Sequence, residues 1–200
     1  VERCGWAGPE QIYLDYHDTE WGVSEFDSRA LWEKLVLDGF QAGLSWITIL
    51  KKRDSFRAAF ADFDPNVIAC WDEREVALLL QDKGIIRHRG KIEATITNAQ
   101  AWQRLEARGG FDRFLWAYMD NAPLQNRWAL QSQVPAQTTL SAQISKDLKA
   151  EGFKFCGPTI VYAFMQAVGM VNDHLVTCPC HAPVAKIGAK RALTLENPAV

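Results

Sequence analysis

Apolar residues recur three or four positions apart along most of the chain, which is the spacing of helices that bury one face. The pattern is clearest in residues 26–43, where Leu31 and Leu35 lie one turn apart on the same face. We expect this helix to end near Gly39 and another to begin near Ser45. No stretch alternates apolar and polar residues convincingly in the manner of a half-buried strand.

Capping residues and glycines divide most of the remaining chain into further helices. Asp64 followed by Pro65 is typical of a helix start, and Gly84 and Gly152 are typical of helix ends. Ser141 is a candidate N-cap. The additional predicted helices span 64–71, 72–84, 87–110, 111–120, 141–152 and 157–169. The sequence therefore predicts an all-α, multi-helix fold.

The last two of these helices are separated only by the short segment GFKFCG. A tight hairpin of this kind leaves backbone N–H groups free at the start of its second helix, near Gly157 and Thr159. Such donors, together with the positive end of the helix dipole, suit one phosphate group. An ordinary helix turn with Gly and Pro as punctuation explains the same residues when they are taken alone.

Composition narrows the function classes. A chain of 200 residues with 48% hydrophobic residues forms one domain with a real core, and it contains no apolar run of membrane-spanning length. Five irregularly spaced cysteines and no export signal favour a reducing cytoplasm. The net charge of −2 does not indicate a nucleic-acid binder, and the basic clusters at 51–53 and 87–91 also fit solvated helix faces.

A candidate metal site begins with His174 and Cys178, which lie four residues apart near the end of the chain. Both are zinc ligands, but two ligands do not complete a site. Cys180 and His181 lie close by and are alternatives. Taken alone, the cysteine near the N-terminus fits a small hydrophobe, and the histidine at position 17 fits a surface residue.

Six stretches, in order along the chain, resemble the 3-methyladenine DNA glycosylase I family of the helix-hairpin-helix superfamily. They are ERCGWA, YLDYHDTEWGV, LVLDGFQAGLSWITILKKR, IIRHRGKI, GFKFCGPTIVYAFMQA and VNDHLVTC. The resemblance implies one glycosylase domain over 1–182, with its hairpin at about 141–169. We expect residues 183–200 to form a C-terminal tail that carries no motif and need not be ordered.

The resemblance implies a structural zinc ion that joins the two ends of the chain. A closed set of four ligands leaves no open position for catalysis. Cys180 and His181 fit the family pattern less well, and Asp173 is a candidate to orient the neighbouring His174. The implied ligands are Cys4, His17, His174 and Cys178.

The same resemblance places an aromatic wall around a base that has been flipped out of double-stranded DNA. It implies that Trp46 and Tyr16 contact the base and that Trp6 and Trp21 complete the wall. Asp38 stands where the family carries a glutamate that hydrogen-bonds the methylated base, so its side chain is one methylene shorter. Without the resemblance, Trp46 and Trp21 fit plain core, and Asp38 fits a helix-end surface acid.

For the DNA backbone, the resemblance implies a wedge at Gly43 and Leu44, between two helices, that fills the gap left by the flipped nucleotide. The hairpin would bind phosphate through Gly157 and Thr159. A buried loop leucine is the alternative for Leu44.

The implied reaction is hydrolysis that releases 3-methyladenine from alkylated DNA, performed by a monomer. No lysine lies between Phe155 and His174, a region that supplies a Schiff-base nucleophile in strand-cutting relatives of the superfamily. We therefore expect an abasic site without a nick. The alternative is a non-enzymatic module that binds damaged or abasic DNA, and a zinc hydrolase is disfavoured by the closed ligand set.

Overall fold

The structure, a computed structural model, describes the backbone of residues 2–196 and the side chains of residues 2–189. It is mostly helical, as the sequence predicts. The helices are α1 (Gln11–Thr19), α2 (Ser28–Gln41), α3 (Trp46–Leu50), α4 (Arg53–Ala59), α5 (Pro65–Ile68), α6 (Glu73–Leu79), α7 (Arg89–Glu106), α8 (Phe111–Trp116), α9 (Thr139–Ala150), α10 (Pro158–Ala167) and α11 (His181–Glu196).

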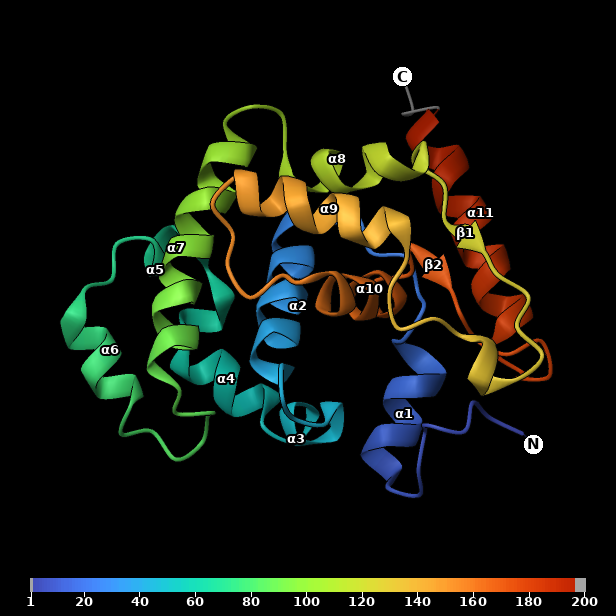
Figure 1. Ribbon diagram of the computed structural model, residues 1–200, viewed down its shortest axis with the longest axis horizontal. Coiled ribbons are helices and arrows are strands. Elements are labelled where there is room, and N and C mark those ends of the chain that lie inside the picture. The colour runs from blue at the N-terminus through green and yellow to red at the C-terminus, as the bar shows by residue number, and fades with distance from the viewer. Residues whose placement is uncertain (1, 197–200) are drawn as a thin grey trace.

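Helix α2 runs through the middle of the molecule, with α5, α6 and α7 on one side and α1 and α11 on the other (Figure 1). It buries successive residues around most of its circumference, which suits a helix that is covered on every side. Asp27 is its N-cap and accepts the Ala30 N–H at 2.8 Å. Because α2 packs against α3, α7, α8 and α10, it connects the parts of the fold that surround it.

Gly39 does not end α2, contrary to the prediction, because the helix continues to Gln41. The glycine is needed for close packing instead. A Cβ at Gly39 would lie 3.3 Å from both the Cβ and the carbonyl oxygen of Phe155 in the hairpin connection. The helix expected from Ser45 also differs, since it divides at Lys51 and Lys52 into α3 and α4.

Two features escaped the sequence patterns. Helix α1 buries only Tyr16 and His17, so it has no apolar stripe to detect. The strands β1 (Leu124–Gln125) and β2 (Val171–Asn172) pair in parallel but are only two residues long, too short for an alternating pattern. Their pairing holds the long connection after α8 against the segment that follows α10.

Helix α11 occupies most of the segment expected to be a tail. It begins at His181, and residues 183–196 are helical rather than unstructured, while residues 197–200 lie outside the described part. The reason is packing against the body of the fold: Val184 is buried, and a Cβ at Gly188 would lie 2.6 Å from Pro123 Cγ. None of the described helices is both long and apolar enough to cross a membrane.

Helices α9 and α10 form the predicted hairpin and pack closely together. Helix α9 starts earlier than expected, because Thr138 is its N-cap and accepts the Ser141 N–H at 3.1 Å. The Ser145 hydroxyl of α9 donates to the Cys156 carbonyl of the connection at 2.6 Å. Pro158 occupies the first turn of α10.

Candidate functional site

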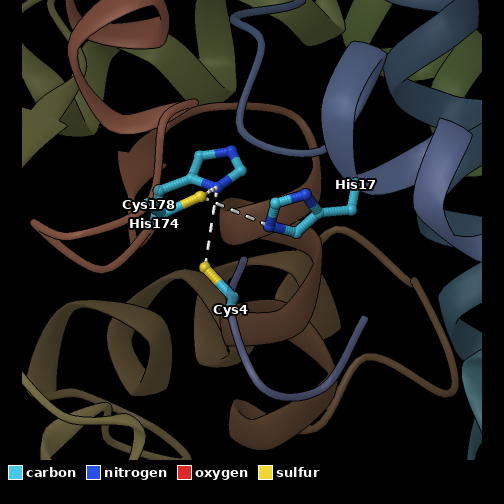
Figure 2. A group of neighbouring side chains, drawn as sticks. All are labelled: Cys4, His17, His174 and Cys178. Atoms are coloured by element: carbon cyan, nitrogen blue, oxygen red, sulfur yellow. Dashed lines mark hydrogen bonds between the residues drawn. The ribbon is translucent and has the colours of Figure 1, made fainter. Parts of the chain in front are cut away.

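Four side chains from the two ends of the chain meet in the interior, as Figure 2 shows for Cys4, His17, His174 and Cys178. Their ligand atoms all lie within 4.8 Å of one another, and all four residues are buried. Cys178 Sγ is 3.6 Å from His174 Nδ1 and 3.7 Å from His17 Nε2. Sulfur and nitrogen ligands at about 2.3 and 2.0 Å from one tetrahedral ion lie roughly 3.5 Å apart, so these four residues could hold a metal ion.

The other nitrogen of each imidazole has a partner outside the cluster. His174 Nε2 lies 2.9 Å from the Trp21 carbonyl oxygen, and His17 Nδ1 lies 2.7 Å from Asp18 Oδ1. Arg3 donates to both oxygens of that carboxylate. These contacts leave the inward nitrogen of each ring with its lone pair toward the cluster, as metal-binding histidines require.

Burial raises the pKa of the Cys4 thiol to about 12, while the Leu175 N–H at 3.4 Å favours the thiolate. A divalent cation among the four ligands would displace the remaining thiol protons. The alternative ligands lie outside the cluster: Cys180 Sγ is 3.8 Å from Asp18, and His181 Nε2 is 2.9 Å from the Asn126 carbonyl.

Asp173 does not orient His174, contrary to the expectation, because Trp21 supplies that contact. Its buried carboxylate instead joins the connection after β1 to helix α10. Four side chains donate to its two oxygens, so both are satisfied without a cation. Its donors are Asn126 Nδ2 at 2.6 Å, Trp128 Nε1 at 2.8 Å, the Tyr162 hydroxyl at 2.6 Å and Gln166 Nε2 at 2.8 Å.

A pocket of about 270 Å³ brings together Asp38 and all four aromatic residues predicted to surround a base. Tyr16, Trp21 and Trp46 are largely buried, so most of each ring packs in the core while part of it lines the pocket. The ring centroids of Tyr16 and Trp46 lie 5.4 Å apart. The full lining is Trp6, Tyr13, Tyr16, Trp21, Lys34, Asp38, Gln41, Trp46, Gln131, Ala163, Gln166 and Ala167.

Asp38 lies on α2 with its carboxylate in this pocket and is only 2% exposed. Its Oδ1 accepts from Lys34 Nζ at 2.6 Å, whereas its Oδ2 has no hydrogen-bond partner among the described residues. Burial raises the pKa of Asp38, and the charge and hydrogen bond of Lys34 oppose that rise. The surface alternative for Asp38 is therefore wrong.

Lys34 is the counter-charge of Asp38, four residues earlier on the same helix. Burial lowers the pKa of Lys34, and Asp38 opposes that fall. The pair is net neutral whichever of the two side chains holds the shared proton. Lys34 Nζ also lies 3.7 Å from the centroid of the Trp46 ring. In the described structure, Trp46 Nε1 is a buried donor that lacks a partner.

Lys91 fixes the loop that follows α2. Its ammonium donates to the carbonyl oxygens of Phe40 at 2.8 Å and Ala42 at 2.7 Å, at the C-terminal end of that helix. Gly43 then adopts a positive φ of 81°, and Leu44 is exposed rather than buried, as a wedge requires.

The start of α10 is accessible. Gly157 is its N-cap, and a Cβ at Gly157 would meet nothing within 4 Å. Thr159, in the first turn, is exposed. The preceding Phe155 lies against Gly39, and the Lys91 ammonium is 6.0 Å from its ring centroid. The hairpin connection and the loop after α2 are therefore neighbours.

Sequence patterns missed three polar residues that complete these sites. Lys34 was identifiable by its i, i+4 spacing from Asp38, but the sequence did not reveal that both side chains turn inward. Gln166 lines the pocket and donates to Asp173 at 2.8 Å. Lys91, in the basic cluster at 87–91, is buried and structural rather than solvated.

Comparisons with known proteins identify related sequences and solved structures. A family model described as methyladenine glycosylase matches residues 6–181. The chain is 50% identical over 182 residues to DNA-3-methyladenine glycosylase 1 of Escherichia coli K12, covering 90% of this chain and 97% of that one. A crystal structure of 3-methyladenine DNA glycosylase I superposes with a TM-score of 0.89 at 51% identity. The alignment covers 90% of this chain and 100% of that one.

A second solved structure concerns 3-methyladenine recognition by 3-methyladenine DNA glycosylase I from Staphylococcus aureus. It has a TM-score of 0.87 and 38% identity, and the alignment covers 89% of this chain and 95% of that one. The mostly helical fold is therefore similar to that of these enzymes.

Proposed function

This chain belongs to the methyladenine glycosylase family, and on that premise we propose that it hydrolyses the N-glycosidic bond of 3-methyladenine in alkylated DNA. The observation that carries the proposal is the pocket, in which aromatic rings surround a buried acid. Asp38 Oδ2 and Trp46 Nε1 are unpartnered acceptor and donor among the described residues, so a ligand with an amine and a ring nitrogen would satisfy both.

The chemistry of the lesion suits such a wall. Methylation at N3 gives the base in DNA a positive charge and makes it a good leaving group, so the enzyme needs little acid catalysis. Aromatic faces attract a cationic ring through their quadrupole. We assign Tyr16 and Trp46 to direct contact with the base, Trp6 and Trp21 to the outer wall, and Asp38 Oδ2 to the exocyclic amine.

The base must leave the duplex to reach this pocket, which requires base flipping. We assign Leu44, exposed on the loop held by Lys91, to the gap that the base leaves in the stack. The N-terminus of α10, at Gly157 and Thr159, would bind a nearby phosphate as the anchor of a helix-hairpin-helix motif. The contact between Phe155 and Gly39 supports joint action of the two elements on one stretch of DNA.

We assign zinc to the cluster of Cys4, His17, His174 and Cys178. Two thiolates and two imidazoles are a typical structural zinc set, and sulfur-to-nitrogen separations of 3.6 and 3.7 Å fit tetrahedral geometry. With four protein ligands, the ion would stabilise the junction of the chain ends and take no part in hydrolysis.

We propose that the product is an intact strand with an abasic site. A strand-cutting glycosylase needs an amine nucleophile, and no lysine occurs between Phe155 and His174. We further propose that the protein acts as a monomer.

The test is release of free base from methylated duplex DNA, detected by chromatography, with Asp38→Asn as the matched control. We expect the parent protein to release 3-methyladenine and leave uncut abasic strands. Binding of damaged duplex without any base release would contradict the enzymatic function and indicate a binding module.

A further inference from the structure

Lys34 places a positive charge in the wall of the pocket that is proposed to hold a cationic base. Its ammonium is held from two directions, by Asp38 Oδ1 at 2.6 Å and by the Trp46 ring at 3.7 Å from its centroid. The side chain is only 16% exposed, so it is a packed part of the pocket rather than a surface lysine.

The lysine changes what the pocket offers a ligand. With Asp38 alone, the pocket would carry a net negative charge and attract a cationic ring strongly at short range. With Lys34 beside it, the net charge of the pair is zero, while Asp38 Oδ2 remains available to accept a hydrogen bond. The pocket therefore retains a directional contact for an amine but has little charge attraction for the ring.

This balance matters because the base loses its charge during the reaction. When the bond between C1′ and N9 breaks, its electron pair passes to N9 and the methylated ring becomes neutral. The positive charge moves to the sugar as an oxocarbenium ion, which a water molecule captures before releasing a proton to solvent. An attraction that fixes charge on the ring stabilises the substrate more than the transition state, and so it slows cleavage.

We propose that Lys34 increases the rate of base release. It cancels the charge of Asp38, weakens binding of the cationic ground state and accelerates departure of the neutral base. The inference rests on the proposed glycosylase function. Lys34 lines the pocket and transfers no proton in this proposal.

The test compares Lys34→Met, which keeps the length but removes the charge, with Lys34→Arg, which keeps the charge. One measurement is the single-turnover rate constant for base release from methylated duplex at saturating enzyme. The other is the affinity for 3,9-dimethyladeninium, a stable cation with no sugar to lose, followed by tryptophan fluorescence. We expect Lys34→Met to lower the rate constant about tenfold or more and to bind the cation about tenfold more tightly. Lys34→Arg should stay within about threefold of the parent in both measurements.

Lys83→Met, at an exposed position between α6 and α7, controls for loss of a lysine elsewhere and should change neither value. Lys34→Gln provides a second neutral variant if the methionine protein does not fold. An unchanged rate constant, or a slower rate together with weaker cation binding, would overturn the inference. Failure of the parent itself to release base would instead refute the proposed function, and the effect of Lys34→Met on cation affinity would still be measurable.

Discussion

Replacing Cys178 with serine removes one of the four atoms that bring the ends of the chain together. Cys178 Sγ lies 3.7 Å from His17 Nε2 and 3.6 Å from His174 Nδ1, so the substitution takes away a thiolate that faces both imidazoles. A serine hydroxyl is a weak zinc ligand at neutral pH, because it does not ionise as a thiol does. We expect the variant to lose zinc while retaining the shape of the surrounding core.

The magnitude follows from the length of chain that the ion would close. Cys4 and His174 are 170 residues apart, and fixing the ends of a loop of that length removes about 5 kcal/mol of unfolded-state entropy. Cross-links commonly deliver less than this value because the unfolded chain retains some structure, so we expect a loss of about 3 kcal/mol. For a chain of this size, that loss lowers the melting temperature by about 10 °C.

The assay measures metal content by mass spectrometry and melting temperature by circular dichroism on the same preparations. The parent should contain about one zinc per chain. Cys180→Ser is the matched control, because its sulfur lies 3.8 Å from Asp18 and outside the cluster, and it should change neither quantity. Zinc and melting temperature that survive in Cys178→Ser, or zinc lost from Cys180→Ser, would refute the assigned ligand set.

The other predictions concern the pocket and the DNA-binding elements. Asp38→Asn should keep the fold and the zinc but bind free 3-methyladenine about ten- to a hundredfold less tightly, the equivalent of roughly 1.5–3 kcal/mol. If the variant binds the free base as tightly as the parent, recognition depends on the aromatic rings alone. Burial raises the pKa of Asp38 above its ordinary value of 3.8, so the parent's affinity for 3,9-dimethyladeninium should fall as the pH decreases, with a midpoint above 3.8. An affinity that does not change with pH would contradict a carboxylate that accepts a hydrogen bond from the ligand. Borohydride during turnover should trap no protein–DNA adduct, since no lysine lies between Phe155 and His174, and a trapped adduct would identify a strand-cutting enzyme. Gly157→Glu should fold, because a Cβ there meets nothing within 4 Å. It should bind an abasic duplex more weakly than the parent, because it places a negative charge at the proposed phosphate site. Binding as tight as that of the parent would exclude the hairpin as the anchor.

Local signals in the sequence were sufficient for most helices. Asp64 followed by Pro65 marks a helix start that the structure contains. Glycines were less reliable, because the same residue type ends helices and allows close packing. Gly39 was interpreted as a terminator, whereas it accommodates Phe155 from a segment more than a hundred residues away.

The sequence patterns missed helices α1 and α11, because local patterns depend on neighbours within a few residues. Helix α1 buries an aromatic ring and a histidine rather than an apolar stripe, so its stability comes from the cluster and the pocket that it helps to build. Helix α11 is ordered through contacts with segments distant in sequence, such as that of Gly188 with Pro123. A short window of sequence around either helix does not contain the residues that stabilise it.

By itself, the sequence determined the helical fold class, the hairpin and, through resemblance to a family, the residues of a cluster and a pocket. Only the tertiary structure decided how those residues are paired. It turned the Lys34–Asp38 pair inward beside Trp46, gave His174 the Trp21 carbonyl in place of Asp173, and buried Lys91 under the loop after α2. The physical reason is that periodicity and caps depend on neighbours a few residues apart. The charge of a buried group depends on which distant side chains surround it, and that is fixed only when the chain folds.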